Sequence, residues 1–433
     1  MGEIIQLGSS SRAPFHDPFQ LAKSRTIDTA AYADALSVEL GWQVPVGTLE
    51  AWQQGTSSPP SSVLQAAQRI SERVFDEATI FDSRHSDQPS EVKRRELLRL
   101  AASGSIGNLV DPALKAIDDL NNLGEKPTGT LIDGLDELVA QLGEQYSRTP
   151  PLHIYRRLDA LTSSTRDLFK IATPAYRTRL WSINGWLTAM LANALYDLGD
   201  DVAAEMNSIL ALEQANRAGD LRLSAFVYDR QAMRTENAGN LMKAMHRFEA
   251  SFQQAPRGTA IHLRALTAYA RVQARLGQHQ LASSALRQAE KLHSLLPQTE
   301  LGDGSLSISP IAVVDTLSST AELDGKLEEA HDASIQTISY YSKLPHPNWR
   351  PTRLALAQLR LASILAGLKR PDEAINIVTS ALETDRIVPP VLLNSGAVTA
   401  RLLRQWPDLP AASNLHEQYN TVAKRTTPRY PIY

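Results

Sequence analysis

The segment "ALYDLGDDVAAE" (194–205) decides the fold, because its pattern recurs four more times along the chain. The later copies are "ENAGNLMKAM" (236–245), "ARLGQHQLAS" (274–283), "AELDGKLEEA" (321–330) and "AGLKRPDEA" (366–374). Each copy has a turn followed five residues later by an alanine, and these alanines are 38 to 48 residues apart. A repeat of this length is typical of supersecondary units that stack one on the next. The aligned alanines are Ala204, Ala244, Ala282, Ala330 and Ala374.

Two further positions of each copy hold small residues in the same register. Seven residues before the turn stand Ala192, Ala232, Ala270, Ser318 and Ala362, and seven residues after the alanine stand Ala211, Ser251, Ala289, Thr337 and Ala381. The turn is Gly199, Gly239, Gly277 and Gly325, with Lys369 in the last copy. Small side chains let antiparallel helices approach closely, and glycine permits the positive φ of a helix stop. The fixed register favours a solenoid of helical hairpins over a generic helical bundle with chance alanines.

The rest of the chain supports an all-α fold. From about 130 to 420 apolar residues recur at helical spacing, and strand patterns are almost absent. The 433 residues are too many for one compact core, so at least two units are expected. We divide the chain into an N-terminal arm (1–27), a small helical domain (28–78), a linker with connecting helices (79–129), the repeat domain (130–420) and a C-terminal tail (421–433).

The small helical domain has the spacing of a helix-turn-helix. The segment "IDTAAYADALSVELGW" (27–42) predicts a first helix with Ala33 and Leu36 in its apolar stripe. A second helix follows in "VPVGTLEAWQQGTSSPP" (44–60), with Val44, Leu49 and Trp52 facing inward, and a third begins near Val63. Such a pair of helices joined by a tight turn can place the second helix in the major groove of DNA.

Both parts of the chain resemble known families. The repeats, over about 150–400, resemble the tetratricopeptide repeat (TPR). The small domain resembles Xre/Cro-type helix-turn-helix domains through Leu40, Gly41, Val44, Thr48, Leu49, Trp52, Gly55, Pro59 and Pro60. Actinobacterial regulators that join such a domain to C-terminal TPR repeats look like the nearest family. The resemblance implies a dimeric, cytoplasmic transcriptional regulator whose repeats sense a ligand.

The predicted DNA-reading helix departs from the family pattern. Pro45 stands where serine is usual, Gln53 replaces a glutamate and Gln54 replaces an arginine. Residues 1–75 carry five Lys or Arg against seven Asp or Glu, which weakens phosphate attraction. Glutamine can still pair with adenine. The alternative is a degenerate domain that contacts protein, in a TPR scaffold or adaptor. The expected DNA contacts are Arg25, Pro45, Gly47, Thr48, Glu50, Ala51, Gln53 and Gln54.

The first helix of each hairpin is expected to line the concave face of the solenoid. On the repeat alignment, two acidic zones flank a basic one there, which suits a peptide, a small polar ligand or a partner protein. Solvated faces of an interaction scaffold are the alternative. The predicted ligand-binding residues are Trp186, Asn193, Tyr196, Asp229, Met233, Glu236, Arg264, Arg271, Asp315 and Glu322, with Thr267, Ser319, Leu356, Leu359 and Ser363 beside them.

Catalysis is not expected. There are no cysteines, and the ten histidines form no metal-ligand spacing such as HExxH. GxSxG, Walker and GxGxxG motifs are absent. The most apolar run, "LWSINGWLTAMLANALYDLG" (180–199), is broken by Ser182, Asn184 and Thr188, so a buried helix is expected rather than a membrane span. No cofactor or metal is predicted.

Overall fold

The computed structural model describes residues 106–345, 350–384 and 386–426, together with Ala33, Leu36, Ser37, 44–53 and Val63. The chain divides into two compact units, Met1–Pro89 and Ser90–Tyr433. Each unit is described by itself.

In the first unit the helix predicted from "VPVGTLEAW" is present as α3 (Val46–Gln53). The backbone N–H groups of Thr48 and Leu49 donate to the Pro45 carbonyl at 3.0 and 3.1 Å, so the helix starts directly after this proline. The Ser37 hydroxyl accepts a 2.8 Å bond from the Val44 N–H and donates to the Ala33 carbonyl. The residues predicted to face the core that are described here are buried: Ala33, Leu36, Val44, Leu49 and Val63.

Other predicted DNA contacts lie outside the described part of this unit. Arg25 and Gln54 are not described, and neither are the side chains of Glu50, Ala51 and Gln53. The third helix and the helix-turn-helix arrangement as a whole therefore stay a prediction.

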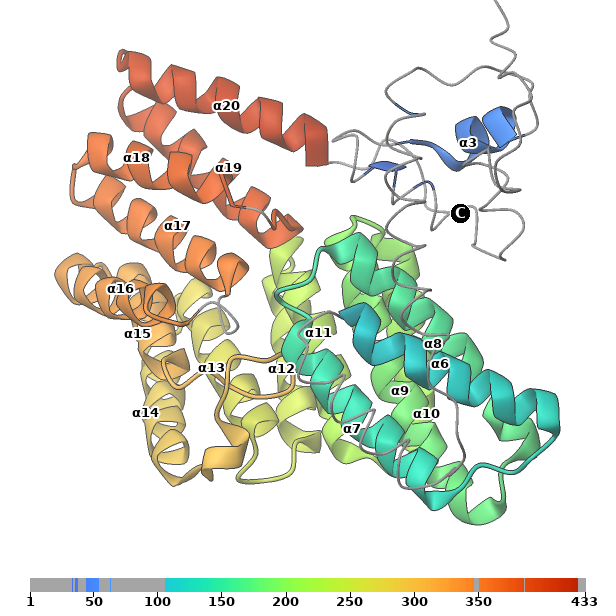
Figure 1. Cartoon of the computed structure of the whole chain (residues 1–433). Helices are drawn as coiled ribbons and strands as arrows, with labels where there is room; N and C mark the ends of the chain where they lie inside the picture. The colour runs from blue at the N-terminus through green and yellow to red at the C-terminus, as the bar shows by residue number, and fades with distance from the viewer. Residues whose placement is uncertain are drawn as a thin grey trace, which may run out of the picture. The chain divides into compact units, whose positions relative to one another are not determined.

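The second unit is all-α in its described part, apart from the short 3-10 helix η1 (Gln298–Glu300) and an isolated bridge between Leu301 and Ile308. Its helices, which follow one another in chain order in Figure 1, are α6 (Ile106–Leu123), α7 (Gly129–Gln145), α8 (Pro151–Ile171), α9 (Pro174–Asp197), α10 (Asp201–Ala218), α11 (Leu221–Asn237), α12 (Leu241–Gln254), α13 (Ala260–Arg275), α14 (His279–Leu295), α15 (Ala312–Leu323), α16 (Leu327–Ser342), α17 (Pro351–Gly367), α18 (Pro371–Leu382), α19 (Pro389–Gln405) and α20 (Pro410–Thr426).

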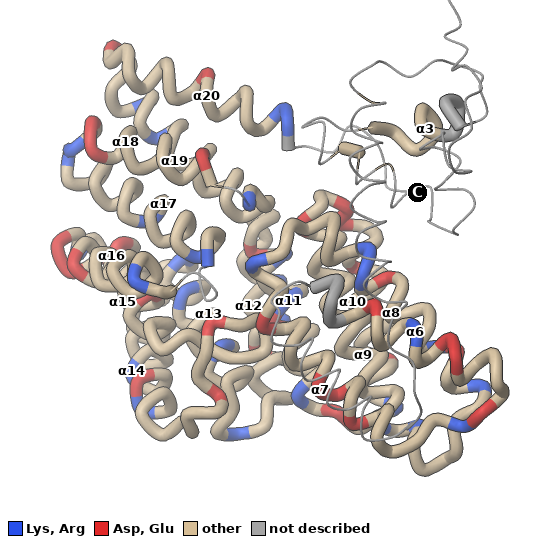
Figure 2. The backbone as a smooth tube through the Cα atoms, in the orientation of Figure 1, with Lys and Arg blue, Asp and Glu red and all other residues tan. Residues whose placement is uncertain are grey.

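From α9 onward the helices form sequential pairs. Each odd-numbered helix packs against the helix that follows it, from α9 with α10 to α19 with α20. The first helices of successive pairs also contact one another, in the order α9, α11, α13, α15, α17 and α19. Hairpins that pack mainly on their neighbours make a TPR-like solenoid, as the repeat pattern predicts. Figure 2 shows basic and acidic stretches interspersed along these helices.

The small-residue positions are the places where the paired helices meet. All fifteen aligned positions are at most 2% exposed, and the polar ones are hydrogen-bonded. The Ser251 hydroxyl donates to the Ala225 carbonyl at 2.8 Å, and the Ser318 hydroxyl donates to the Ala330 carbonyl at 3.0 Å. Buried hydroxyl groups need such partners to offset the loss of water. The predicted close packing at these positions is confirmed.

The five turns share one hydrogen bond. In each, the N–H of the residue after the turn position bonds to the carbonyl five residues earlier, for example Lys326 to Ala321 and Arg370 to Leu365, both at 2.9 Å. This helix stop requires a positive φ at the turn residue. Gly325 has φ 77°, and Lys369 takes the same region at 59° without being glycine.

We expect substitutions at the glycine turns and at the lysine turn to change the free energy of unfolding in opposite directions. Gly325→Ala should lower the free energy of unfolding by about 1 kcal/mol, because alanine is strained at positive φ. No atom lies within 4 Å of the added Cβ, so packing does not contribute. Lys369→Gly should raise the free energy by up to about 1 kcal/mol. Urea unfolding followed by circular dichroism measures both, and a neutral Gly325→Ala would contradict the argument.

Candidate ligand-binding cleft

A cleft of about 880 Å³ runs along the first helices of the hairpins. Its lining comes mainly from α9, α11, α13, α15, α17 and α19. Further residues come from α12, α16, the α14–α15 loop, the two residues after α7 and the connection before α19 that contains Arg386. This is the surface that the repeat pattern predicts to be concave. Its volume lies in the range of about 300–1,000 Å³ that is usual for small-molecule sites.

The lining is rich in charge. It holds eight arginines and six carboxylates, which leaves a formal surplus of two positive charges. Apolar side chains such as Met233 and Leu356 lie between them. The arginines are Arg230, Arg264, Arg271, Arg275, Arg353, Arg360, Arg386 and Arg401, and the carboxylates are Asp197, Asp229, Glu236, Asp303, Asp315 and Glu322.

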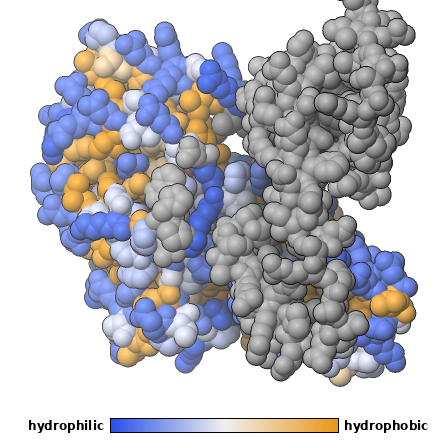
Figure 3. Space-filling view, viewed as in Figure 1, coloured by the Kyte–Doolittle hydropathy of each residue, from blue (hydrophilic) through white to orange (hydrophobic). Residues whose placement is uncertain are grey.

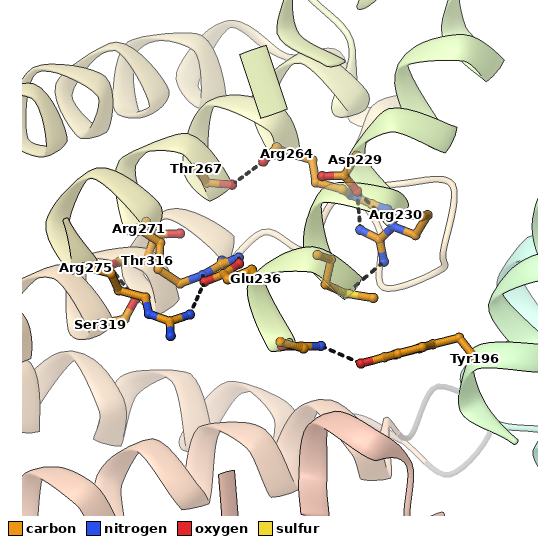
Figure 4. Close-up of polar contacts among 12 residues, drawn as sticks. Tyr196, Asp229, Arg230, Glu236, Arg264, Thr267, Arg271, Arg275, Thr316 and Ser319 are labelled. Atoms are coloured by element: carbon orange, nitrogen blue, oxygen red, sulfur yellow. Dashed lines mark hydrogen bonds and ion pairs between the residues drawn. The ribbon is translucent and has the colours of Figure 1, made fainter. Parts of the chain in front are cut away.

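Glu236 of α11 is held by two arginines of α13 (Figure 4). Arg271 donates from Nε at 3.0 Å and from Nη2 at 2.7 Å, and Arg275 Nη1 lies 3.0 Å from the same carboxylate. Burial opposes the charge of Glu236, but the attraction of Arg271 and Arg275 is greater and lowers its pKa. Burial likewise opposes the charge of Arg271, yet the pair with Glu236 raises its pKa. Glu236 is therefore engaged within the wall of the cleft.

Four other carboxylates of the lining also have an arginine partner. The pairs are Asp197 with Arg386 at 2.6 Å, Asp229 with Arg230 through Nε at 2.9 Å, Glu322 with Arg401 at 3.6 Å, and Asp315 with Arg360. Two arginines remain: among the described residues, Arg264 and Arg353 form no ion pair with a carboxylate. Arg271 and Arg275 share Glu236, and Asp303 has no arginine partner in the described ranges, so the surplus of two belongs to the lining as a whole. Arg264 and Arg353 are the two arginines in it that lack a carboxylate partner within those ranges.

Arg386 joins distant parts of the solenoid. Besides its ion pair with Asp197 at the end of α9, it donates from Nε to the Thr149 carbonyl at 3.0 Å and from Nη1 to Thr352 at 3.1 Å. The Tyr146 hydroxyl donates to the same Asp197 carboxylate at 3.0 Å, and its ring lies beneath Arg386. Burial, then the charge of Asp197, raises the pKa of Tyr146, which stays protonated as a donor. These contacts join the first hairpin to the connection between α18 and α19.

The long α14–α15 connection makes a second link across the unit. The Ser305 N–H donates to the Gly143 carbonyl at the end of α7 at 2.9 Å, and Leu306 packs so closely that a Cβ at Gly143 would lie 2.6 Å from its Cγ. Arg350 donates to the Asp303 carbonyl at 2.7 Å and reaches Glu144 at 3.3 Å. The α14–α15 connection therefore forms part of the cleft wall.

The structure brings nearly all the predicted ligand-binding residues to this cleft. Asn193, Tyr196, Asp229, Met233, Glu236, Arg264, Arg271, Asp315 and Glu322 line it, as do Thr267, Ser319, Leu356, Leu359 and Ser363. Their role in binding stays a prediction.

Trp186 does not line the cleft. Its indole N–H donates to Asp220 at 3.0 Å, and its ring packs on Phe226 with centroids 5.2 Å apart. It lies in the core between α9 and α11, earlier along α9 than the residues that reach the cleft.

Six arginines of the cleft were missed from the sequence: Arg230, Arg275, Arg353, Arg360, Arg386 and Arg401. Helical spacing from the predicted Leu356 and Ser363 would have found Arg353 and Arg360, because residues three or four apart share a face. Arg386 had no such signal, since it lies in a connection between hairpins.

Within the described ranges, no group of three or more His, Asp or Glu side chains is placed to hold a metal ion. No helix in the same ranges has both the length and the apolar composition needed to cross a membrane.

Comparison with known proteins adds no family assignment. No protein-family model and no curated protein matches the chain. Solved structures align at low similarity. BtubC (BKLC) from P. vanneervenii is 15% identical with a TM-score of 0.40, and the alignment covers 54% of this chain and 90% of that one. For a STAND ATPase with a tetratricopeptide repeat sensor from Pyrococcus horikoshii the identity is 14%, the TM-score 0.36 and the coverage 96% of this chain and 66% of that one; for the P58(IPK) TPR domain the identity is 13%, the TM-score 0.23 and the coverage 78% and 99%. The fold assignment rests instead on the pairing and stacking of this chain's own helices.

The link through Arg386 should make a large contribution to stability. Arg386→Met should lower the free energy of unfolding by about 3 kcal/mol, because Asp197, whose side chain is 12% exposed, is then left without its cation. Arg370→Met, which removes an exposed pair with Glu373, is the matched control and should change little. Urea unfolding measures both variants. Equal effects of the two substitutions would show that the Arg386 link does not hold the repeats together.

Proposed function

We propose that the protein is a transcriptional regulator whose repeat unit binds a ligand that controls DNA binding by the N-terminal unit. The observation that carries the proposal is the charged, half-enclosed cleft along the first helices of the repeats. A receptor site combines shape with a few placed polar groups, and this cleft has both.

Polar atoms in the cleft support a ligand-binding role. The side-chain oxygens Asn193 Oδ1 and Asp303 Oδ1 are buried in its lining and have no hydrogen-bond partner among the described residues. An unsatisfied buried acceptor costs about 1–3 kcal/mol. A ligand that donates hydrogen bonds to these atoms would recover that free energy. The same wall offers arginine donors, so the cleft suits a ligand that carries both donors and negative charge.

The DNA-binding part rests on α3. Its start at Pro45 and the burial of Leu49 fit the second helix of a helix-turn-helix, and Gln53 stands at its end. A ligand that binds one arrangement of the protein better than another shifts the population toward that arrangement. We therefore propose that the ligand changes the DNA-competent fraction. A cytoplasmic homodimer on an operator is the form in which we expect it to act.

A protein-binding scaffold is the second candidate. The outward face of α10 exposes Val202, Met206 and Ile209, which are 78%, 63% and 52% exposed. These residues fall at helical spacing and form an apolar stripe, a feature often found at protein contacts. Figure 3, by comparison, shows apolar and hydrophilic residues interspersed over the helices α15 to α20. In this candidate the N-terminal unit contacts protein instead of DNA.

DNA titration separates the two candidates. The full chain should bind DNA from upstream of its own gene more tightly than scrambled DNA at about 0.15 M salt. The logarithm of the affinity should fall with the logarithm of salt concentration by about 0.9 for each phosphate neutralised. Fluorescence anisotropy with labelled duplexes measures both. Absence of binding even at low salt would favour the scaffold.

The predicted base contacts can be tested in the same assay. Gln53→Ala combined with Gln54→Ala should remove the preference for the upstream DNA while leaving helix content unchanged, because glutamine reads adenine edges. The matched control is Gln278→Ala combined with Gln280→Ala, on exposed positions of the repeat unit. A preference that survives in the Gln53 and Gln54 variant would exclude these residues as readers.

A further inference from the structure

Among the residues that the structure describes, two arginines of the cleft lack a carboxylate partner. Arg264 is near the start of α13, Arg353 is near the start of α17, and both face the cleft. After burial, the positive charge of Arg230, and less strongly that of Arg353, lowers the pKa of Arg264. The other arginines of the lining have a carboxylate partner. Two cations without an ion-pair partner therefore share this end of the cleft.

Arg264 is held rigidly although it is almost entirely buried. It is 8% exposed and donates to the carbonyls of Ser305, at 2.8 Å, and Ser307. Burial, and then the positive charge of Arg230, lowers the pKa of Arg264 to about 9. The guanidinium stays charged at neutral pH, but its surroundings disfavour that charge. A buried charge is stable only when it is paired or well hydrogen-bonded, and two neutral carbonyls supply only part of that requirement.

The acidic groups nearby do not cancel this charge. Asp315 is paired with Arg360, and Asp229 is paired with Arg230. Asp303 accepts a 2.9 Å hydrogen bond from Tyr340 through Oδ2. Burial opposes the charge of Arg353, but Tyr341, which also forms a hydrogen bond with it, and the charges of Asp303 and Asp315 outweigh burial and raise the pKa of Arg353.

We propose that this end of the cleft binds the phosphate group of a small phosphate monoester, with Arg264 and Arg353 as its ligands. The inference rests on the proposed function only in taking the cleft as the ligand site. A phosphate monoester carries about 1.5 to 2 negative charges at neutral pH, which matches the two arginines that lack a carboxylate partner. The planar guanidinium fork suits phosphate oxygens better than it suits a single point charge.

The rest of the cleft suits the organic part of such a molecule. Ile308, Ala312 and Leu356 supply apolar surface in the same lining, and Asn193 offers its unpaired side-chain oxygen. A volume of about 880 Å³ is larger than a phosphate ion needs, so the organic part contributes to affinity.

Calorimetric titration of the full chain tests the proposal with phenyl phosphate as the probe, and with phenylacetate as a carboxylate of similar size. We expect phenyl phosphate to bind and phenylacetate to bind at least about tenfold more weakly, because it carries one negative charge instead of nearly two. Inorganic phosphate should compete with phenyl phosphate. Failure of phenyl phosphate to bind, or equal binding of the carboxylate, would overturn the proposal.

Variants locate the site. Arg353→Gln should weaken phenyl phosphate by about tenfold or more, since a hydrogen bond to a charged group is lost. Arg401→Gln is the matched control, because it removes the same charge from the same cleft at a residue paired with Glu322. Arg264→Gln should act like Arg353→Gln, and thermal unfolding checks that it is folded. If the Arg264→Gln variant is not folded, the binding measured for Arg353→Gln alone decides whether the site is assigned correctly. Equal weakening by Arg401→Gln would show only a general charge effect and overturn the assignment.

The outcome is separable from that of the proposed function. Phosphate binding that is lost in Arg353→Gln, in a chain that binds no operator DNA, would support the site and refute the regulator. Operator binding by a chain that does not bind phenyl phosphate would refute the phosphate site and leave the regulator supported.

Discussion

The structure depends on the close approach of two helices at three small-residue positions per hairpin. At Ala204, Ala192 and Ala211, and at their counterparts in the other hairpins, no side chain is large enough to separate the helices. Close packing makes each hairpin a rigid unit with one face for the next hairpin and one for the cleft. The regular register then aligns the first helices, so that charged residues far apart in the chain reach one surface.

The charged side chains of the cleft are mostly arranged as ion pairs. Apart from Asp303, which bonds to Tyr340, every carboxylate of the lining has an arginine partner, and several pairs join neighbouring hairpins, as Glu236 does with Arg271 and Arg275. Pairs of this kind hold the wall in one geometry, because breaking a buried pair leaves a costly isolated charge. Against this neutralised wall, the unpaired Arg264 and Arg353 stand out as the place where an anion would gain most.

Two contacts outside the repeat pattern add residues to the lining of the cleft and join distant parts of the solenoid. Arg386, in the connection between α18 and α19, reaches Asp197 of the first hairpin, and the α14–α15 loop reaches α7 through Ser305 and Gly143. An open solenoid is flexible because its repeats contact only their neighbours. Contacts between distant repeats limit that flexibility. A ligand that touches both the early and the late repeats would limit the same motion of the solenoid. The proposed regulator would need such a coupling between its binding site and its conformation.

The sequence by itself determined the hairpins, their order and the face that lines the cleft. Small residues and glycines act locally, through the backbone of a turn and the contact of adjacent helices, so their spacing can be recognised in the sequence. Even Lys369 was identifiable as the exceptional turn residue. Only the tertiary structure decided which arginines are paired, that Arg386 reaches Asp197, and that Trp186 is turned into the core. These features depend on contacts between residues up to about two hundred positions apart, and local spacing carries no record of such distances.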